Sequence, residues 1–383
     1  KISFQERSRL FKLPKSSWAD YDRTLISKGG GIYSRQLKSI SLSPEVQLAL
    51  NCNAKALTPA DLVRAILQAP VDLLWSGGIG TYVKASWERH ADVGDRINDA
   101  QRINARELRC RSIGEGGNLG LTQAARIEYA QQGGRLDTDF IHNVGGVNCS
   151  DHEVNIKILL NQVVAAGELE LDQRNELLAQ MTEEIATLVL QDSYWQGCAI
   201  SLDEARSTTL LPEHTRFIRY LEQSGRLNRV LEGLPSEKEL KRRQRQQQGL
   251  TRPEIAVLIA YAKHNLYEDL LASDLPEDIG LLSELERYFP YALRTRFQTY
   301  IHNHPLRREI LCTIIANRLV NRFGSTFVFR LQEIIYSPIA TIVRTITVIW
   351  EIFALSSLWS LAPTIPTALR LNLLNRAGQL VGR

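Results

Sequence analysis

The chain has 383 residues, 44% of them hydrophobic and 23% charged, a composition typical of a soluble globular protein that excludes a disordered, collagen-like or small disulfide-stapled one. Its 46 basic residues nearly balance 42 acidic ones, and the net charge of +4 gives no footprint of nucleic-acid binding. Five scattered cysteines, an odd number, favour a reducing, cytoplasmic location. Because the sequence starts at Lys1 without an apolar signal region, we expect a fragment or a processed product.

Helical segments and short apolar runs alternate in the first part of the chain. Helix starts are predicted at Ser43-Pro44 and Thr58-Pro59, because serine or threonine caps a helix and proline fits its first position. Residues 71–75 are predicted to form a short buried strand, which ends in a turn containing Gly77 and Gly78. A long polar helix is expected over about 85–109.

Two more strands are predicted, each followed by a glycine-rich turn. The first, 108–113, precedes the turn 114–118, and a helix over 122–132 leads to the second strand, 138–141, and the turn 142–146. Strand, turn, helix and strand in repetition is typical of a parallel sheet with crossover helices. Ligands of such sheets bind at the carboxyl ends of the strands, where all three glycine clusters fall.

After residue 160 almost every segment has helical periodicity. The sequence therefore predicts an α/β domain over 1–160, a partial Rossmann-like parallel sheet with crossover helices, followed by an all-α domain over 161–383. Capping boxes, with glutamate three residues after the cap, predict helix starts at Ser150, Ser201, Ser236 and Thr251.

Two segments of the helical half have an unusual composition. Residues 238–249 are strongly polar; such a run can bind an anion, but a solvated helix end or linker is the favoured interpretation. Residues 334–361 are the most apolar stretch, but they carry Arg344 and Glu351 one heptad apart and are followed by Pro363 and Pro366. This pattern predicts a packed amphipathic helix and not a membrane span.

Glycines 114, 116 and 120 follow a predicted strand and precede a predicted helix. Their spacing, with Asp137 and Asp139 about twenty residues further on, nearly meets the dinucleotide-binding fingerprint, in which glycines let the backbone approach a pyrophosphate. A tight strand–helix turn without a ligand accounts for the spacing about equally well.

Polar side chains and glycines also crowd into residues 142–152. A metal site of His142, Cys149 and His152 lacks a fourth ligand at convincing spacing. A nucleophile pair of Cys149 and His152 is disfavoured, because neighbours at a helix start rarely face each other. A cofactor or substrate cradle fits best: Gly145 and Gly146 admit a flat ring, and Asn143 can bond a carboxamide. Ser150 is equally explained as a helix cap.

Eight strings of residues, spread over nearly the whole chain, are distinctive. They are Ser17–Asp22, Leu25–Gly31, Asp72–Lys84, Val93–Arg96, Gly114–Gly120, Cys149–Asn155, Leu250–Glu254 and Phe327–Glu333. With these strings the chain resembles the large NAD-specific glutamate dehydrogenases of bacteria. The resemblance implies oxidative deamination of L-glutamate to 2-oxoglutarate and ammonia, with hydride transfer to NAD, in a cytoplasmic homo-oligomer.

A looser likeness to the small glutamate dehydrogenases implies roles for individual residues. Their Glu-Gly-x-Asn turn is matched by 115–118, and their Asp-x-x-x-Asn-x-Gly-Gly-Val-x-x-Ser run by 139–150. The likeness implies that Asn118 and Asn143 contact the nicotinamide ribose and carboxamide, and that Ser150 contacts the distal carboxylate of glutamate. The turn 114–120 then serves the nicotinamide side and not the pyrophosphate. The expected cofactor-binding residues are Gly77, Gly78, Gly116, Gly117, Asn118, Asn143, Gly145 and Gly146.

The family's pyrophosphate loop and its catalytic lysine and aspartate lie upstream of the part that begins here. Hydride transfer at a carbon bearing nitrogen needs groups that handle protons. We therefore expect no catalytic residue and no metal ligand in this chain, which alone should be inactive or nearly so. Expected partners are L-glutamate and 2-oxoglutarate, with neither nucleic acid nor membrane. The alternative is that the helical half, 161–383, is a scaffold for oligomerisation or a regulatory module without catalysis of its own.

Overall fold

The computed structural model describes residues 1–361 and 364–382 and divides the chain into two compact units, Lys1–Leu136 and Asp137–Arg383. Pro363, the expected stop of the apolar stretch, lies outside the described residues. The predicted boundary at residue 160 falls within the helix α7 (Val144–Ala165). Ile156, Leu159 and Leu160 of this helix are fully buried in the core of the second unit, so the chain divides before α7 and not within it.

The first unit combines short helices with three two-stranded sheets. Besides short 3₁₀ turns, its α-helices and strands are α1 (Ile2–Phe11), β1 (Ile40–Ser41), α2 (Pro44–Leu50), β2 (Ala56–Leu57), α3 (Pro59–Leu67), β3 (Leu73–Ser76), β4 (Val83–Lys84), α4 (His90–Val93), β5 (Ile103–Asn104), β6 (Ser112–Glu115) and α5 (Gln123–Gln131). β1 and β2 are antiparallel, whereas β3 pairs with β6 and β4 with β5 in parallel. The predicted parallel pairing is therefore confirmed.

The local sequence pattern predicted three helices of this unit correctly. α2, α3 and α5 begin directly after Ser43, Thr58 and Thr122, and each of these side chains accepts a hydrogen bond from a backbone amide of the first turn. The strand at 71–75 was predicted to be buried, and this is wrong for part of it: Leu73 and Trp75 of β3 are 56% and 60% exposed. Among the described residues β3 has one neighbouring strand, β6, and the face carrying these two side chains is left open.

The predicted long helix over 85–109 is wrong. α4 ends where Gly94 adopts a left-handed conformation with φ of 77°, which glycine adopts without strain. The chain then returns to form β5 beside β4. Arg102 fixes this return, because its side chain is fully buried and its Nε donates a 2.8 Å hydrogen bond to the carbonyl of Thr81.

The predicted third strand, 138–141, is also wrong. These residues form the one-turn helix α6 (Asp139–His142) in the second unit, since a short apolar run does not by itself distinguish a strand from a buried helical turn. Next to β6, on the chain before α6, one isolated parallel bridge between Ser112 and Arg135 is present in place of a third strand.

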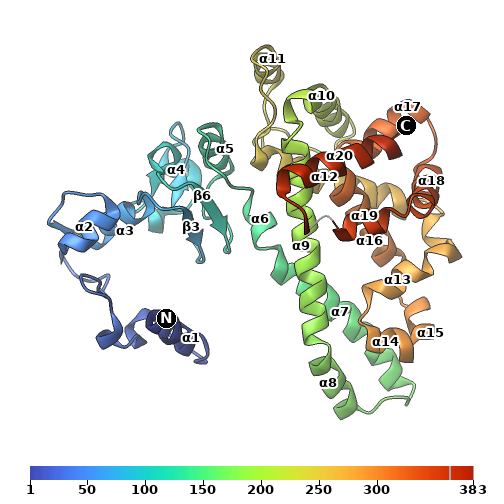
Figure 1. Ribbon diagram of the computed structural model, residues 1–383, viewed down its shortest axis with the longest axis horizontal. Coiled ribbons are helices and arrows are strands. Elements are labelled where there is room, and N and C mark those ends of the chain that lie inside the picture. Colours follow the sequence, from blue (N-terminus) through green and yellow to red (C-terminus); the bar gives the residue numbers. More distant parts are fainter. Residues whose placement is uncertain (362–363, 383) are drawn as a thin grey trace. The chain divides into compact units, whose positions relative to one another are not determined.

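The second unit is all-helical in its described elements. They are α6, α7, α8 (Leu171–Gln180), α9 (Thr182–Glu204), α10 (Ser207–Gln223), α11 (Glu237–Arg245), α12 (Arg252–Leu271), α13 (Leu282–Tyr288), α14 (Tyr291–Arg296), α15 (Gln298–His302), α16 (Arg307–Phe323), α17 (Phe327–Ile335), α18 (Ile339–Ile352), α19 (Leu355–Leu361) and α20 (Thr367–Val381). The long helix α9 packs against α7, α12 and α16, and these four helices supply much of the core (Figure 1). The predicted order, α/β followed by all-α, is confirmed.

Two of the four predicted capping boxes mark helix starts. Ser236 and Thr251 cap α11 and α12, and Glu254 completes the box at Thr251. Ser150 and Ser201 instead lie inside α7 and α9, so the predicted cap role of Ser150 is wrong. Both helices are long and have buried faces, and this packing keeps the chain helical on both sides of a serine that could otherwise cap a helix start.

Of the two interpretations of residues 238–249, the linker is wrong, because 237–245 form α11; the solvated helix end fits most of the run, which is exposed, but not Arg243, which is buried. The apolar stretch 334–361 is not one helix: Tyr336, with φ of 52°, ends α17, and Pro338 precedes α18. No single described helix is long and apolar enough to cross a bilayer. The pair α17 and α18 passes that test of length and composition only together, bent by 114°.

Candidate nucleotide- and substrate-binding residues

In the first unit the carboxyl ends of β3 and β6 lie side by side. The register pairs Ser76 with Glu115, so the turns that follow the two strands start next to each other. The backbone amides of Gly116 and Gly117 both donate to the carbonyl of Ser76, at 2.8 and 3.1 Å. The predicted residues Gly77, Gly78, Gly116, Gly117 and Asn118 are thus brought together at one edge, with the side chain of Asn118 exposed.

Close backbone packing explains why glycine occupies this edge. A Cβ on Gly117 would lie less than 3.0 Å from the carbonyl oxygen of Gly78, a separation that real Cβ atoms essentially never show. A Cβ on Gly116 would lie 2.6 Å from the indole of Trp75, whose ring covers the bare backbone of β6. The two turns therefore touch through backbone, and side chains do not separate them.

A buried ion pair holds β6 to the helix that follows it. Arg126 of α5 donates its Nε and Nη2 to the two carboxylate oxygens of Glu115, at 2.8 Å each. The side chains of Glu115 and Arg126 are 0% and 5% exposed. Bidentate pairing of this kind satisfies both charges away from water and fixes the strand end from which Gly116 departs.

In the second unit the predicted residues occupy the start of α7. Asn143 precedes the helix, and its backbone amide donates to Asp139 at 2.8 Å. Gly145 and Gly146 lie in the first turn, where backbone amides have no partner within the helix. Asn143, Gly146 and Ser150 follow helical spacing along one face, and both Gly146 and Ser150 are exposed. A first-turn amide and a hydroxyl on one open face suit an anionic or amide group of a ligand.

A charged cluster anchors the one-turn helix in front of Asn143. Asp137 lies 3.4 Å from Nε2 of His142 and accepts a 2.8 Å hydrogen bond from Nε of Arg252. Burial opposes ionisation of Asp137, but His142 and Arg252 outweigh it and hold the pKa of this carboxyl below its usual value. The cluster therefore ties α6 to the start of α12.

The metal and nucleophile interpretations of 142–152 gain no support. Cys149 is exposed on α7, whereas the ring of His152 is buried and stacks on Tyr288 with centroids 4.4 Å apart. His142 faces Asp137, so the three candidate ligands point to different surroundings. Within 1–361 and 364–382, no group of three or more His, Cys, Asp or Glu side chains is placed to hold a metal ion.

Sequence reasoning missed a cavity of about 490 Å³ on the other side of α7. Asp151, His152, Asp192 and Tyr288 are among its lining residues, and Tyr288 donates a 2.7 Å hydrogen bond to Asp151. Burial raises the pKa of Asp192 and lowers that of His152. The lining comes from α7, α9, α13 and α16, which lie far apart in the chain, and no local spacing signals such a cavity.

The open backbone fits a flat cofactor ring. No heavy atom lies within 4 Å of the place that a Cβ would take on Gly78 or on Gly146, so both positions leave bare backbone accessible. Gly78 belongs to the first unit, as does Asn118, and Gly146 belongs to the second, as does Asn143. That Asn118 and Asn143 flank one ring stays a prediction.

The protein belongs to the class with an α/β unit followed by an all-α unit. The α/β unit carries glycine turns at the carboxyl ends of its parallel strands. A family described as bacterial NAD-glutamate dehydrogenase, catalytic domain, matches residues 1–203, and a second one, glutamate dehydrogenase, C-terminal, matches 247–383. The first match covers more than half of the chain, which therefore belongs to the bacterial NAD-glutamate dehydrogenase family.

Similar proteins carry the same description. The chain is 51% identical over 353 residues to an NAD-specific glutamate dehydrogenase of Pseudomonas aeruginosa, covering 92% of this chain and 22% of that protein. It is 48% identical over 376 residues to one of Mycobacterium tuberculosis, covering 96% of this chain and 23% of the relative. The chain thus spans about a fifth of the length of the curated relatives it matches.

Proposed function

We propose that the protein carrying this chain is an NAD-dependent glutamate dehydrogenase that oxidatively deaminates L-glutamate to 2-oxoglutarate and ammonia. The paired glycine turns at the carboxyl ends of β3 and β6 support this proposal most directly, because they leave bare backbone where ligands of parallel sheets bind. Its relatives, named NAD-specific glutamate dehydrogenases, support the choice of NAD as cofactor.

In this proposal the chain binds and orients NAD and glutamate, and it supplies no group that transfers a proton. NAD, when bound, accepts the hydride. Gly77, Gly78, Gly116 and Gly117 admit the nicotinamide ring against backbone, and Asn118 and Asn143 bond its ribose and carboxamide. Gly145 and Gly146 keep the first turn of α7 open, and Ser150 donates to the distal carboxylate of glutamate. The catalytic lysine and aspartate lie outside this chain, which alone is inactive.

Replacing Asn143 by alanine in the complete protein tests the cofactor contact. A carboxamide that loses its buried partner costs about 1–3 kcal/mol, so the KM for NAD should rise roughly tenfold or more. Asn303→Ala, at an exposed position at the end of α15, is the matched control and should leave that KM unchanged. Equal NAD kinetics for Asn143→Ala and wild type would remove the assignment.

We also propose that the protein is a cytoplasmic homo-oligomer. Five free cysteines support the reducing compartment. Val348 and Ile352 lie one turn apart on α18 and are 58% and 71% exposed, an apolar face that suits a second copy of the chain. Light scattering on the complete protein tests this: Ile352→Lys should lower the molar mass, whereas Val230→Lys, at another exposed apolar position, should not. A protein that is monomeric at high concentration would contradict it.

A further inference from the structure

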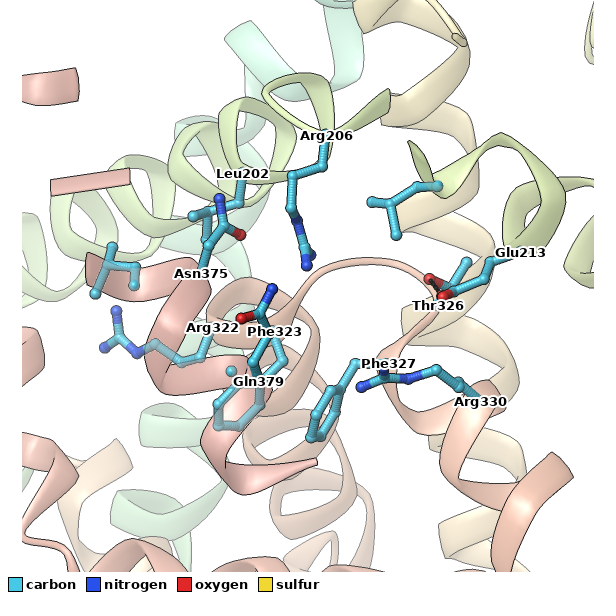
Figure 2. A pocket seen from close by; sticks show the side chains of 13 residues that line it. Leu202, Arg206, Glu213, Arg322, Phe323, Thr326, Phe327, Arg330, Asn375 and Gln379 are labelled. Carbon is cyan, nitrogen blue, oxygen red and sulfur yellow. Dashed lines mark hydrogen bonds between the residues drawn. The ribbon is translucent and has the colours of Figure 1, made fainter. Parts of the chain in front are cut away.

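A second, much smaller cavity lies within the helical unit, away from α7. It has a volume of about 40 Å³, is partly open, and is lined by side chains of α9, α10, α16, α17 and α20 and by Arg206, between α9 and α10 (Figure 2). Since one water needs roughly 10–15 Å³ of such volume, the cavity holds about three waters or one small ion. It is too small for an amino acid or a nucleotide.

Cationic side chains dominate this cavity. Arg206 and Arg330 point into it from different sides in Figure 2, and the Nε of each is buried without a hydrogen-bond partner among the described residues. Arg322 also lines the cavity, but its guanidinium lies over the ring of Trp195, 3.5 Å from the centroid. Glu213, the one lining carboxylate among the described residues, accepts a 3.1 Å hydrogen bond from Thr326. Cations therefore outnumber anions around the space.

The remaining polar lining adds neutral donors. Asn375 and Gln379 lie one turn apart on α20 and reach the same cavity. Each side-chain amide offers two N–H donors, and each guanidinium offers five. Donors from three directions around a partly open pocket match an oxyanion or a halide, and an anion bound there would compensate two guanidiniums whose Nε atoms are buried without a partner among the described residues.

We propose that this cavity is a binding site for a small inorganic anion, contacted by Arg206, Arg330, Asn375 and Gln379. Orthophosphate and chloride share the required charge and size. Because α20 packs against α9 and α16, and Arg330 belongs to α17, the bound anion links the C-terminal helix to the rest of the unit. Anion concentration would then control how firmly α20 is docked, independently of the proposed dehydrogenase activity.

Thermal unfolding of the full chain tests the site. Sodium phosphate, sodium chloride and sodium gluconate are compared at constant ionic strength, since gluconate is too large to enter. At about a hundredfold excess over Kd, the anion that binds should raise Tm by about 3–5 °C relative to gluconate. A rise with phosphate or with chloride supports the site and identifies its occupant. Equal Tm values in all three salts overturn it.

Two variants and one control separate this site from general salt effects. Arg206→Met and Arg330→Met should each abolish the anion-dependent rise in Tm, and in gluconate they should be about as stable as wild type, because both arginine side chains are only half-buried. Arg216→Met removes an arginine that is already paired with Glu333, and it should keep the full response. A response that survives in both cavity variants overturns the proposal. Equilibrium dialysis of the wild type against labelled phosphate and labelled chloride should give one bound anion per chain, and none bound overturns it without requiring any variant to fold.

Discussion

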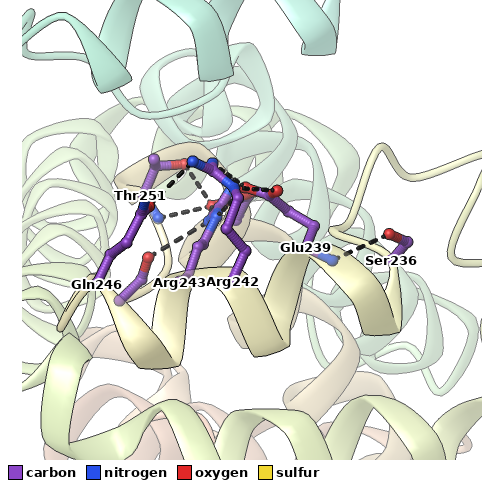
Figure 3. A network of polar contacts seen from close by, with 8 residues as sticks. Ser236, Glu239, Arg242, Arg243, Gln246 and Thr251 are labelled. Atoms are coloured by element: carbon purple, nitrogen blue, oxygen red, sulfur yellow. Dashed lines mark hydrogen bonds and ion pairs between the residues drawn. The ribbon is translucent and has the colours of Figure 1, made fainter.

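Arg243 of α11 and Glu254 of α12 form a bidentate ion pair with distances of 2.7 and 2.9 Å, and their side chains are only 4% and 1% exposed. The same carboxylate accepts hydrogen bonds from the backbone amide and the hydroxyl of Thr251, at 2.7 Å each. Figure 3 shows this network between the charged helix α11 and the start of α12. Arg243 also pairs with Glu239 at 2.9 Å, whereas Arg243 is the cationic partner of the buried Glu254, so the charge of Glu254 depends on Arg243 for compensation.

Arg243→Met should therefore destabilise the protein strongly. Removing one member of a buried pair leaves the other charge unpaired, at a cost of about 3–5 kcal/mol in the free energy of unfolding. Chemical denaturation monitored by circular dichroism measures this loss. Arg242→Met is the control: this neighbour is 53% exposed and pairs with Glu239 at the surface, so its loss should change stability little. Equal effects of the two substitutions would contradict the assigned role of the buried pair.

The same segment shows where prediction from sequence ends. The serine cap and the glutamate three residues after it predicted the start of α11 correctly, since both act within one helical turn. The charged run that follows indicated a solvated helix end or linker, and most of it is an exposed helix end, yet Arg243 is buried while Arg242 is not. The burial of Arg243 depends on Glu254, which belongs to the next helix. Composition within one window does not contain that tertiary contact.

The buried ring of His152 should make stability depend on pH. Burial lowers the pKa of His152 below its usual value near 6.5, although Asp151 and Asp192 oppose the shift. A histidine whose pKa is lowered in the folded state contributes stability above about pH 6.5, and this is lost as the pH falls through the folded-state pKa. His152→Phe, which can still stack on Tyr288, should flatten the decline in stability between about pH 6.5 and 5.

Urea denaturation of wild type and variant across that pH range measures the difference in slope. His264→Gln is the control, because His264 is 70% exposed and pairs with Glu268 at the surface. If His152→Phe and wild type lose stability in parallel, the acid-dependent loss comes from other groups.

The candidate site was predictable only in part, for a related reason. Parallel pairing of β3 with β6 places two turns at one edge, and strand–turn–helix order is enough to anticipate that. The exposure of Trp75 and the helical state of 138–141 were not predictable, because both depend on which neighbours cover these residues. The cavity beside His152 was missed since four helices contribute to its walls.

Arg126→Met should weaken the first unit and the proposed cofactor edge together. The buried Glu115 would lose both of its 2.8 Å partners on Arg126, at a cost of about 3–5 kcal/mol. Replacing both residues by leucine should recover much of the stability, because no uncompensated charge remains. Arg111→Met, which removes a surface pair with Asp72, should change little. Thermal unfolding of the four proteins checks this order, and a double variant less stable than Arg126→Met would contradict it.

Two glycines of the same edge should respond differently to substitution by alanine, one in stability and the other in the KM for NAD. Gly117→Ala places a Cβ against the carbonyl oxygen of Gly78, and such overpacking should cost about 1–3 kcal/mol of stability. Gly78→Ala meets no protein atom within 4 Å, so stability should hold while the KM for NAD rises about tenfold, because the methyl group occupies space proposed for the cofactor. Gly280→Ala, at an equally open position in the helical unit, should alter neither quantity. Thermal unfolding and NAD titration of the complete protein distinguish the three variants. Should Gly78→Ala leave the KM for NAD unchanged, the open space at this turn is not where the ring lies.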